Sequence, residues 1–288
     1  MHKLGTVSVG GSNPVRIMGT LNTSPESFYK KSIHTSKRNI TQAVRLMEAQ
    51  GADIIDVGGM STAPYLSTMI PEKIEAKRIT DAIKIIQNVS NLPISIDTCR
   101  ASVAIEALEF GVEIINDVSG LKYDKQMLDV VKIYQPSLVL CAFSKKIIMG
   151  NIKQQTQKLL KQSLHLAKLA GVPKTKIIVD PAIGFFRKSG KSPFFTKITL
   201  DWAQRDLNIL ADLDSFKCGQ PLLVSVSNKS FIGKILNKPN PVDRLPGSLA
   251  AEVVAIINGA DIIRTHNVKQ SKRLVMVAKN FLRSNKSL

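Results

Sequence analysis

Residues 51–62, which read GADIIDVGGMST, contain the clearest evidence for the architecture of this chain. Gly51 is the kind of residue that ends a helix, because glycine adopts left-handed backbone angles at low cost. The apolar run after it is hydrophobic on both faces, which is typical of a parallel strand covered on both sides. The run ends in the polar pair Ser61-Thr62. The stretch therefore predicts one repeat of helix, turn, buried strand and polar loop.

Seven further runs have the same apolar character, at residues 15–22, 94–97, 114–118, 137–143, 176–184, 221–227 and 261–268. Helical periodicity separates the strands at residues 38–50, 73–89, 100–110, 124–134, 151–170, 200–213, 247–258 and 269–282. Glycines stand where several of these helices end, at Gly51, Gly111, Gly171 and Gly259. Eight strands alternating with eight helices predict an α/β protein, a single-domain (β/α)8 TIM barrel. The rival is a doubly wound sheet, which typically has a G-x-G-x-x-G turn after its first strand, and this chain has none.

The predicted barrel covers residues 15–283. Residues 1–14 form an N-terminal segment in which Val7–Val9, before a pair of glycines, predict part of a hairpin at the barrel bottom. Residues 284–288 predict a frayed tail. A chain of 288 residues is long enough for one such barrel, which typically takes about 250 residues.

Three widely spaced cysteines, Cys99, Cys141 and Cys218, give neither a disulfide framework nor a zinc motif. The N-terminus lacks the apolar run of a signal peptide, and no apolar run reaches membrane-spanning length. We therefore expect a soluble cytoplasmic protein with reduced thiols and no membrane partner.

The net charge of +18 requires nucleic-acid binding to be considered. The basic residues are scattered, however, and aromatic residues make up only 5% of the chain, so stacking platforms for bases are not evident. We expect no nucleic-acid partner. A basic surface also suits an anionic small substrate such as a diphosphate. One basic cluster occurs in a single loop, at Arg187, Lys188, Lys191 and Lys197.

Polar residues follow most of the predicted strands at the end where barrel enzymes carry their chemistry. They are Asn22, Asp56 with Thr62, Asp97, Asn116 with Asp117, Asp180, Lys229, and Arg264 with His266. The fifth strand ends in Cys141-Ala142-Phe143 and lacks a strong polar group. A single Asp or Asn at a strand end is usually a turn or cap, as we expect for Asp117. Seven polar strand ends at one mouth would be a coincidence if all were caps, so the set predicts a binding site.

The chemistry of this set suits a flat nitrogen heterocycle carrying an anion. Asp97, Asn116, Asp180 and Lys229 offer the donors and acceptors that amino and oxo groups need. Arg264 and His266 are two residues apart on one strand, so they share a face and can meet one anion. Asn22 offers a neutral oxygen that a hard metal ion could use together with phosphate.

In order along the chain, these strand ends resemble the signatures of the dihydropteroate synthase family. The segments are MGTLNTSPESF (18–28), GADIIDVGGMST (51–62), ISIDT (94–98), GVEIINDVSG (111–120), IIVDPAIGF (177–185), SNKSFIG (227–233) and GSLAAEVVAIINGADIIRTHNV (247–268). The resemblance covers nearly the whole chain. It implies a transferase of folate or methanopterin biosynthesis that displaces diphosphate from a 6-hydroxymethyl-dihydropterin diphosphate by an arylamine.

The resemblance also implies roles for individual residues. Asn22 would bind the Mg²⁺ that holds the diphosphate, and Asp97, Asn116, Asp180 and Lys229 would bind the pterin. Arg264 would flank the pterin ring and hold the diphosphate with His266. The catalytic set would be Asp97, Lys229, Arg264 and His266. Thr62 and Ser230 would lie near the arylamine, with Phe185 as an apolar wall, while the loops at residues 23–37 and 60–71 would close. A homodimer would form through the last barrel helices.

The chain departs from the family pattern at the acceptor end. Ala63 and Asn228 stand where arginines are usual, Met60 replaces an acidic residue, and Ala182 replaces a glycine. The acceptor is therefore open between 4-aminobenzoate and a ribosyl-phosphate arylamine, whose phosphate the bases from Arg187 to Lys197 could meet unless they are solvated. Two other readings are a pterin-dependent methyltransferase and a catalytically inactive pterin-binding protein. SNKSFIG and the pair Arg264 and His266 argue against the methyltransferase, which has no diphosphate to hold.

Overall fold

A ring of parallel strands forms the centre of the molecule. The computed structural model describes residues 1–27, 29 and 33–284. Within these residues the sheet has the order β11-β12-β3-β4-β5-β6-β7-β8, and each pair of neighbours is parallel. A single bridge between Val179 and Leu222 joins the two ends of this sheet. The predicted TIM barrel is confirmed.

The strands are shorter than the sequence runs that predicted them. Their bounds are β3 Arg16–Asn22, β4 Ile54–Gly58, β5 Ile94–Asp97, β6 Ile114–Asp117, β7 Ser137–Cys141, β8 Ile177–Asp180, β11 Leu223–Val224 and β12 Ile262–Thr265. The prediction for residues 221–227 was wrong in extent, because the chain turns after Val224 and Asn228 takes a left-handed conformation at φ 57°. The prediction for residues 176–184 overshot because Pro181 lacks the N–H that a continuing strand needs.

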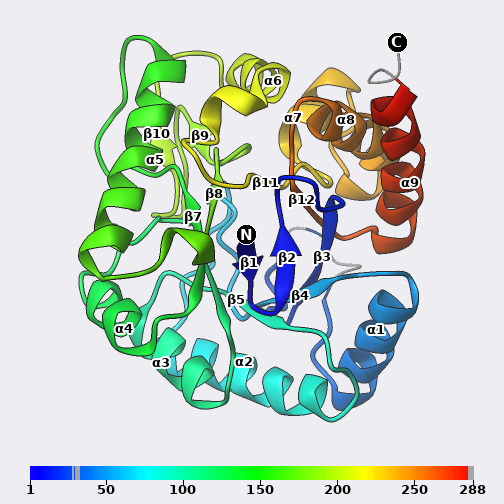
Figure 1. The fold of residues 1–288 in the computed structure, drawn as a ribbon. Coiled ribbons are helices and arrows are strands. Elements are labelled where there is room, and N and C mark those ends of the chain that lie inside the picture. Colours follow the sequence, from blue (N-terminus) through cyan, green and yellow to red (C-terminus); the bar gives the residue numbers. More distant parts are fainter. Residues whose placement is uncertain (28, 30–32, 285–288) are drawn as a thin grey trace.

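Helices surround the strands as an outer layer (Figure 1). They are α1 Lys37–Ala49, α2 Glu72–Gln87, α3 Ala101–Glu109, α4 Met127–Tyr134, α5 Ile152–Leu169, α6 Trp202–Ala211, α8 Leu245–Ile257 and α9 Val268–Ser284. A short helix α7, Ser230–Ile235, was not predicted. The predicted helix-ending glycines Gly51, Gly111, Gly171 and Gly259 all have left-handed backbones, with φ between 76° and 98°. Ser284 belongs to α9, and the remaining predicted tail lies outside the described residues.

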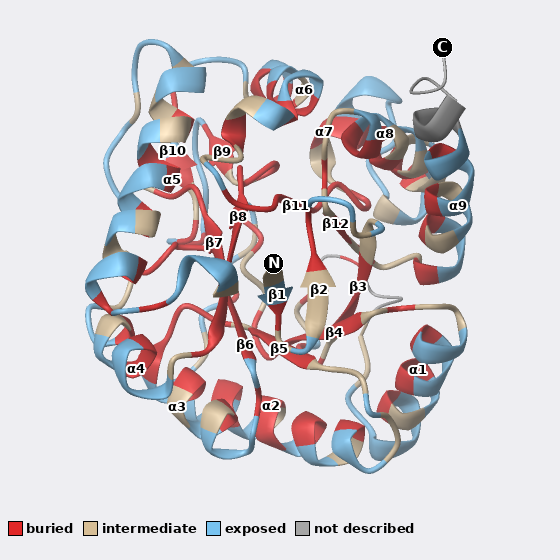
Figure 2. Ribbon diagram, viewed as in Figure 1, coloured by how far each residue is buried: buried red, intermediate tan, exposed pale blue. Residues whose placement is uncertain are grey.

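A hairpin closes the bottom of the barrel. Strands β1 (His2–Leu4) and β2 (Val7–Val9) pair antiparallel and lie in the middle of the ring in the view of Figure 1. Leu4 and Val9 are buried against inward side chains of the barrel strands, including Met18, Ile54 and Ile114. Buried residues line these strands, while the helices expose their outer faces (Figure 2).

The polar residues at the floor of the mouth lie directly above the apolar layer, that is, the inward side chains that pack against the hairpin. Side chains two residues apart on a strand point to the same face, so each apolar residue of the layer is followed inside the barrel by the residue two positions later. Those following residues include Thr20, Asp56, Asn116, Asp180 and Arg264. A layer of apolar side chains at the bottom therefore supports a layer of polar side chains above it.

The loop after β8 contains a small sheet of its own. Strands β9 (Phe186–Arg187) and β10 (Thr196–Lys197) pair in parallel, and Phe186 of β9 and Phe194, which precedes β10, are buried. This pairing gives the predicted basic loop a fixed shape.

In the part of the chain that the structure describes, no helix combines the length and apolar character that crossing a bilayer would require.

Candidate functional site

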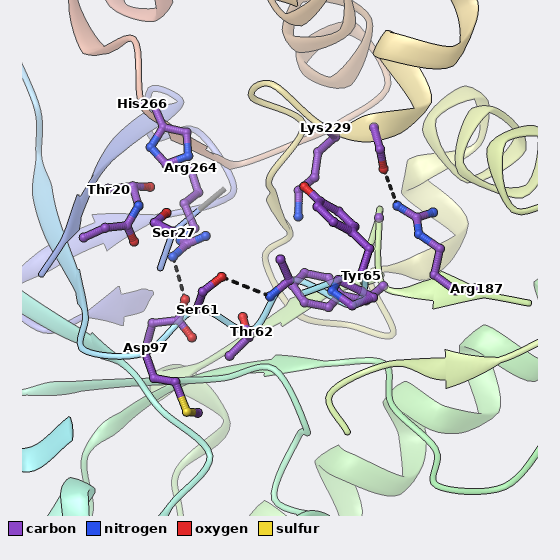
Figure 3. A pocket seen from close by; sticks show the side chains of 17 residues that line it. Thr20, Ser27, Ser61, Thr62, Tyr65, Asp97, Arg187, Lys229, Arg264 and His266 are labelled. Atoms are coloured by element: carbon purple, nitrogen blue, oxygen red, sulfur yellow. Dashed lines mark hydrogen bonds and ion pairs between the residues drawn. The ribbon is translucent and has the colours of Figure 1, made fainter. Parts of the chain in front are cut away.

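A cavity opens at the carboxyl ends of the strands (Figure 3). Of the residues predicted from the sequence, those lining it are Asn22, Thr62, Asp97, Phe185, Lys229, Ser230, Arg264 and His266. Asn116 and Asp180 are buried and do not line the cavity. The predicted residues therefore converge on one mouth, with Asn116 and Asp180 lying deeper in the barrel.

The floor of the cavity is a network of hydrogen bonds centred on Asp56. Arg264 donates from Nε to Asp56 Oδ2 at 2.6 Å and from Nη2 to Asp97 Oδ2 at 2.7 Å. Asn116 Nδ2 donates to Asp56 Oδ2 at 3.2 Å. Asp180 accepts from the backbone N–H of Ala182 at 2.7 Å. Sequence reasoning noted Asp56 on its strand but gave it no role, although a buried carboxylate within an apolar strand was the available signal.

This floor carries more carboxylates than cations. Burial raises the pKa of Asp97 to about 7, with Asp56 raising it further and Arg264 opposing the shift. Burial by itself would lower the pKa of Arg264, but Asp56 and Asp97 outweigh it, so the pKa is raised and the guanidinium stays charged. Two carboxylates sharing one guanidinium leave acceptor capacity for a ligand that presents several N–H donors.

Lys229 lies at the other side of the cavity against the loop after β8. Its Nζ is 4.3 Å from the centroid of the Phe185 ring. Gly184 has φ 88°, and a Cβ there would come within 2.8 Å of Lys229 Cδ, so a side chain at this position would displace the lysine. Burial lowers the pKa of Lys229 to about 8, with the charge of Arg264 acting in the same direction. Lys229 thus stays largely protonated near neutral pH.

His266 lines the same cavity but differs from Arg264 in charge. Burial lowers the pKa of His266 to about 3, and the charges of Arg264 and Lys229 lower it further. Its ring lies 5.0 Å from the ring of Tyr29, measured between centroids. At neutral pH the imidazole is therefore neutral in the free protein, whereas Arg264 and Lys229, which line the same cavity, carry positive charge.

The predicted acceptor end is lined by Thr62, Phe185 and Ser230, and also by Tyr65, which was not predicted from the sequence. Arg187, one of the bases that the sequence offered to an acceptor phosphate, lines it as well. Its Nη2 donates to Ser230 Oγ at 2.5 Å (Figure 3). The sequence did not distinguish Arg187 from the other bases of its loop.

The basic cluster divides into two parts. Arg187 is buried, with 6% of its surface exposed, and its guanidinium lies 3.8 Å from the centroid of the Trp202 ring. Lys188, Lys191 and Lys197 are exposed. Of these four bases Arg187 is the one that lines the cavity, so the solvated alternative does not hold for Arg187, and contact of the other three with an acceptor phosphate stays a prediction.

Ala63 and Asn228, which stand where arginines are usual in the family, lie in different surroundings. Ala63 lines the cavity and leaves its acceptor end without a cation from that loop. Asn228 is buried away from the cavity, where its Oδ1 accepts from Ser248 Oγ at 3.3 Å and its side chain hydrogen-bonds Tyr29. Arg244 Nη1 donates to the backbone oxygen of Asn228 at 3.0 Å. Asn228 therefore supports the turn before Lys229 and does not form part of the cavity wall.

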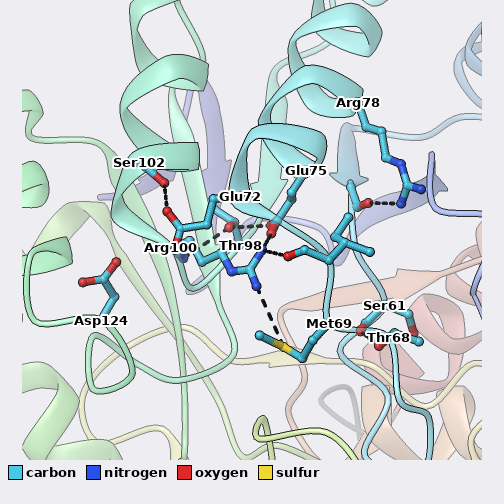
Figure 4. Close-up of polar contacts among 12 residues, drawn as sticks. Ser61, Thr68, Met69, Glu72, Glu75, Arg78, Thr98, Arg100, Ser102 and Asp124 are labelled. Carbon is cyan, nitrogen blue, oxygen red and sulfur yellow. Dashed lines mark hydrogen bonds and ion pairs between the residues drawn. The ribbon is translucent and has the colours of Figure 1, made fainter.

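The loops over the mouth are tied to the barrel by arginines. Arg78 of α2 donates to both carboxylate oxygens of Glu26, at 3.0 and 3.1 Å, and to the backbone oxygen of Gly59 at 3.1 Å. Arg100 donates to Glu75 and to the backbone oxygen of Ile70, both at 2.8 Å (Figure 4). These bonds hold the ends of the two loops that were expected to close. Residues 28 and 30–32 of the first loop lie outside the described residues.

Asn22 is the residue expected to bind Mg²⁺, and it lines the cavity. Among the described residues there is no group of three or more His, Cys, Asp or Glu side chains that could hold a metal ion. Mg²⁺ commonly keeps several waters and binds through few protein oxygens plus substrate phosphates. A single amide oxygen therefore fits a metal that arrives with a phosphorylated substrate.

Comparison with known proteins agrees with the site. Residues 18–266 match the family model described as pterin binding enzyme. The chain is 34% identical over 270 residues to a dihydropteroate synthase of Synechocystis, covering 91% of this chain and 88% of the relative. It is 34% identical over 273 residues to that of Clostridium beijerinckii, covering 94% and 96%.

Solved structures of similar proteins have the same fold. The dihydropteroate synthase of Clostridium difficile, determined in the presence of pteroic acid, superposes with a TM-score of 0.82 at 34% identity and covers 98% of this chain and 99% of that one. The enzyme of Xanthomonas albilineans in complex with 7,8-dihydropteroate superposes with a TM-score of 0.78 at 26% identity, covering 94% of both chains.

Proposed function

The chain belongs to the pterin-binding enzyme family as a transferase of the dihydropteroate synthase type, and from this premise we propose that it joins a 6-hydroxymethyl-dihydropterin diphosphate to 4-aminobenzoate in folate biosynthesis. The observation that carries the proposal is the convergence of Asp97, Lys229 and Arg264 on one cavity. The same cavity therefore offers the Asp97 carboxylate to a pterin and the cations Lys229 and Arg264 to a diphosphate.

The pterin binds over the floor of the cavity. Its amino and ring N–H groups donate to Asp97, and Asn116 and Asp180 complete the polar surface below. Arg264 is bonded to Asp97 in the free protein, so a pterin that takes over Asp97 leaves the guanidinium available to the diphosphate. Lys229 supplies the second positive charge.

The reaction breaks the C–O bond between the pterin methylene and the diphosphate and forms a C–N bond to the arylamine. The electron pair of the C–O bond leaves with the diphosphate, where Arg264 and Lys229 stabilise the developing negative charge. Asp97 stabilises the cationic pterin methylene. The aniline nitrogen attacks with its own lone pair, and its proton passes to water or to the departing diphosphate.

Mg²⁺ would be held by Asn22 together with the substrate diphosphate, and it would neutralise charge on the leaving group. This part of the proposal has its own test. Binding of the pterin diphosphate, measured by calorimetry, should weaken when Mg²⁺ is replaced by EDTA and should lose its Mg²⁺ dependence in Asn22→Ala. An unchanged Mg²⁺ dependence in that variant would contradict the role of Asn22.

The direct test of the function is turnover. The full chain, Mg²⁺ and dihydropterin methyl diphosphate should release diphosphate and form dihydropteroate when 4-aminobenzoate is added, and release none without it. A methyltransferase would act on methyl-tetrahydropterin and a corrinoid with no diphosphate involved. An inactive binding protein would bind the pterin and turn over neither mixture.

One observation favours a larger acceptor as a second candidate. A groove adjoins the cavity and shares Tyr65 and Ser230 with it, and its walls include Lys234 and Arg244. Arg244 is buried and donates to backbone oxygens, so Lys234, which is paired with Asp201 at 2.8 Å in the free protein, would receive the phosphate of a ribosyl-phosphate arylamine that enters past Ser230. Offering this acceptor and 4-aminobenzoate in turn, with kcat/KM as the readout, distinguishes the two.

We also propose that the chain forms a homodimer through its last barrel helices. Large apolar side chains are exposed there, at Val254 and Ile257 of α8 and Met276 and Val277 of α9. Sedimentation velocity should give a dimer for the wild-type chain and a monomer for Ile257→Glu.

We propose that the protein is cytoplasmic, because its three cysteines are free thiols.

A further inference from the structure

A buried cluster of charged side chains lies beside the acceptor end of the cavity. Asp206 is fully buried, and two guanidiniums approach it: Arg205 Nη1 lies 3.0 Å from Oδ1, and Arg187 Nη1 lies 3.7 Å from Oδ2. Lys229 and Asp180 lie close enough to interact with this group electrostatically. These charges continue into the floor of the cavity, because Arg264 interacts electrostatically with both Lys229 and Asp180.

Two guanidiniums of this cluster approach Asp206, and only one of them can also meet a ligand in the cavity. Arg205 cannot be the group that meets a ligand, because it is bonded to the backbone oxygens of Pro181 and Ala182 and does not line the cavity. Arg187 does line it. Arg187 is therefore the guanidinium beside Asp206 that faces the cavity.

The guanidinium of Arg187 is fixed in position. It lies over the Trp202 ring at 3.8 Å, donates to Ser230 Oγ at 2.5 Å and donates to the backbone oxygen of Phe186 at 3.3 Å. Figure 3 shows Arg187 on the side of Tyr65 and Lys229, away from Asp97. A planar guanidinium held this way is organised in advance for a carboxylate.

The arrangement of the two ends orients the acceptor. The pterin methylene must lie between the floor at Asp97 and the acceptor end at Ser230, because both line one cavity. The amine of the acceptor must point toward that methylene, so the group on the opposite side of its ring points toward Arg187. Ala63 offers no competing cation there.

We propose that Arg187, together with Ser230, binds the anionic group of the arylamine and selects an anionic acceptor over a neutral one. This inference rests on the proposed function, since it assigns the acceptor specificity of that reaction. Arg187 is a specificity-determining residue in this account, and the chemistry at the methylene does not involve it.

The test compares two acceptors of similar size, 4-aminobenzoate and the neutral 4-aminobenzamide, with purified full-length variants. Arg187→Met should lower kcat/KM for 4-aminobenzoate by roughly 10- to 100-fold through KM, because a hydrogen bond to a charged group is lost. Turnover of 4-aminobenzamide and KM for the pterin diphosphate should stay near their wild-type values. Arg187→Lys should fall between, since it keeps the charge and loses the planar fork.

Lys188→Met is the matched control, because Lys188 is the neighbouring base and is exposed. It should leave both acceptors unaffected. Equal losses for the two acceptors in Arg187→Met would mean a merely structural role and would overturn the inference, as would no loss at all. If Arg187→Met does not fold, as judged by thermal unfolding, Arg187→Lys decides with the same two acceptors.

The failure of the proposed function has a different signature. In that case wild-type protein turns over neither acceptor, and direct binding of 4-aminobenzoate and 4-aminobenzamide by calorimetry tests Arg187 independently. Tighter binding of 4-aminobenzoate that disappears in Arg187→Met would support the anion site. Equal binding of the two compounds by wild-type protein would refute it.

Discussion

Arg264 and Asp97 are bound to each other in the free protein, with Arg264 Nη2 donating to Asp97 Oδ2 at 2.7 Å. Each comes from a different strand, β12 and β5, and each is expected to meet a different part of the substrate. Asp56 shares the same guanidinium. Binding of the pterin therefore replaces an internal ion pair, and the protonation state of Asp97 decides whether the exchange is favourable.

The first prediction concerns pH. Asp97 has a pKa raised to about 7 by burial, and Lys229 has a pKa lowered to about 8 by burial. The reaction needs Asp97 ionised and Lys229 protonated, so kcat/KM for the pterin diphosphate should fall below about pH 7 and above about pH 8. Measured on Lys229→Arg, the profile should lose its alkaline limb. A flat profile between pH 6 and 9, taken as a range of roughly one unit beyond each value, would refute the assignment.

The second prediction concerns Asp97 itself. Asp97→Ala should reduce diphosphate release by at least roughly 100-fold, because it removes a charged hydrogen-bond acceptor that both binds the pterin and stabilises its methylene cation. Circular dichroism should show an unchanged fold. Asp81→Ala is the control, since Asp81 is an exposed acid on α2. Full activity of Asp97→Ala would exclude a pterin role for this residue.

The third prediction concerns a buried acid outside the site. Glu252 of α8 accepts from Ser271 Oγ of α9 at 2.6 Å, and burial raises its pKa from 4.5 to about 7. A raised carboxyl pKa means that the folded state holds the proton more tightly, so its stability contribution is complete below pH 4.5 and is lost as the pH rises through about 7. Glu252→Gln should therefore gain stability relative to wild type at pH 8, by up to roughly 3 kcal/mol, and little at pH 4.5. Chemical denaturation at the two pH values measures this, and a pH-independent difference would contradict it.

The fourth prediction concerns the loop after β3. Arg78 joins Glu26 of this loop to the backbone oxygen of Gly59. Arg78→Met should lower kcat/KM by roughly 10-fold, because the loop that covers the mouth is no longer tied to α2. The free energy of unfolding should change by about 1 kcal/mol or less, as for other partly exposed ion pairs. Lys77→Met removes the neighbouring exposed pair with Asp81 and should leave activity intact. Equal activity of the two variants would mean that the tie has no part in closure.

The fifth prediction concerns backbone strain at Ala182, which stands where the resembling family has glycine. Its φ of 59° lies in the left-handed region, where a Cβ is unfavourable. Ala182→Gly should relieve that strain, and the greater flexibility of unfolded glycine should offset part of the gain, leaving about 1 kcal/mol. Thermal unfolding of the two proteins measures the difference. A lower unfolding midpoint in the variant would show that the methyl group contributes packing that outweighs the strain.

Sequence alone was enough for the barrel and for the composition of its mouth, because both follow from local patterns. An apolar run such as IINDV at residues 114–118 identifies a strand, and the polar residue near its end must point into the barrel or toward a turn. Asp117 is an example of the second kind, since its side chain accepts from the backbone N–H groups of Ser119 and Leu121, as predicted.

The sequence did not predict the placement of side chains that are held by contacts with residues far away in the chain. Nothing local distinguishes Arg187 from Lys188, because Arg187 is placed by the small β9–β10 sheet and by the ring of Trp202. Likewise, the pairing of Asp56 with Arg264 joins residues 208 positions apart in sequence. The short extent of β11 has a similar origin, since the turn that ends it is held by Arg244 and Ser248.

The single bridge between Val179 and Leu222 has a mechanical consequence. Every other pair of neighbouring strands is joined over two or more registered residues, so this seam has the shortest ladder in the ring. The loops that follow β8 and β11, bearing Arg187 and Lys229, flank it on either side. The side of the mouth proposed to receive the arylamine is therefore built on the strands with the shortest ladder. The side proposed to receive the pterin is built on strands with longer ladders, such as β4 and β5. Amide protons along β11 should exchange with solvent sooner than those along β4.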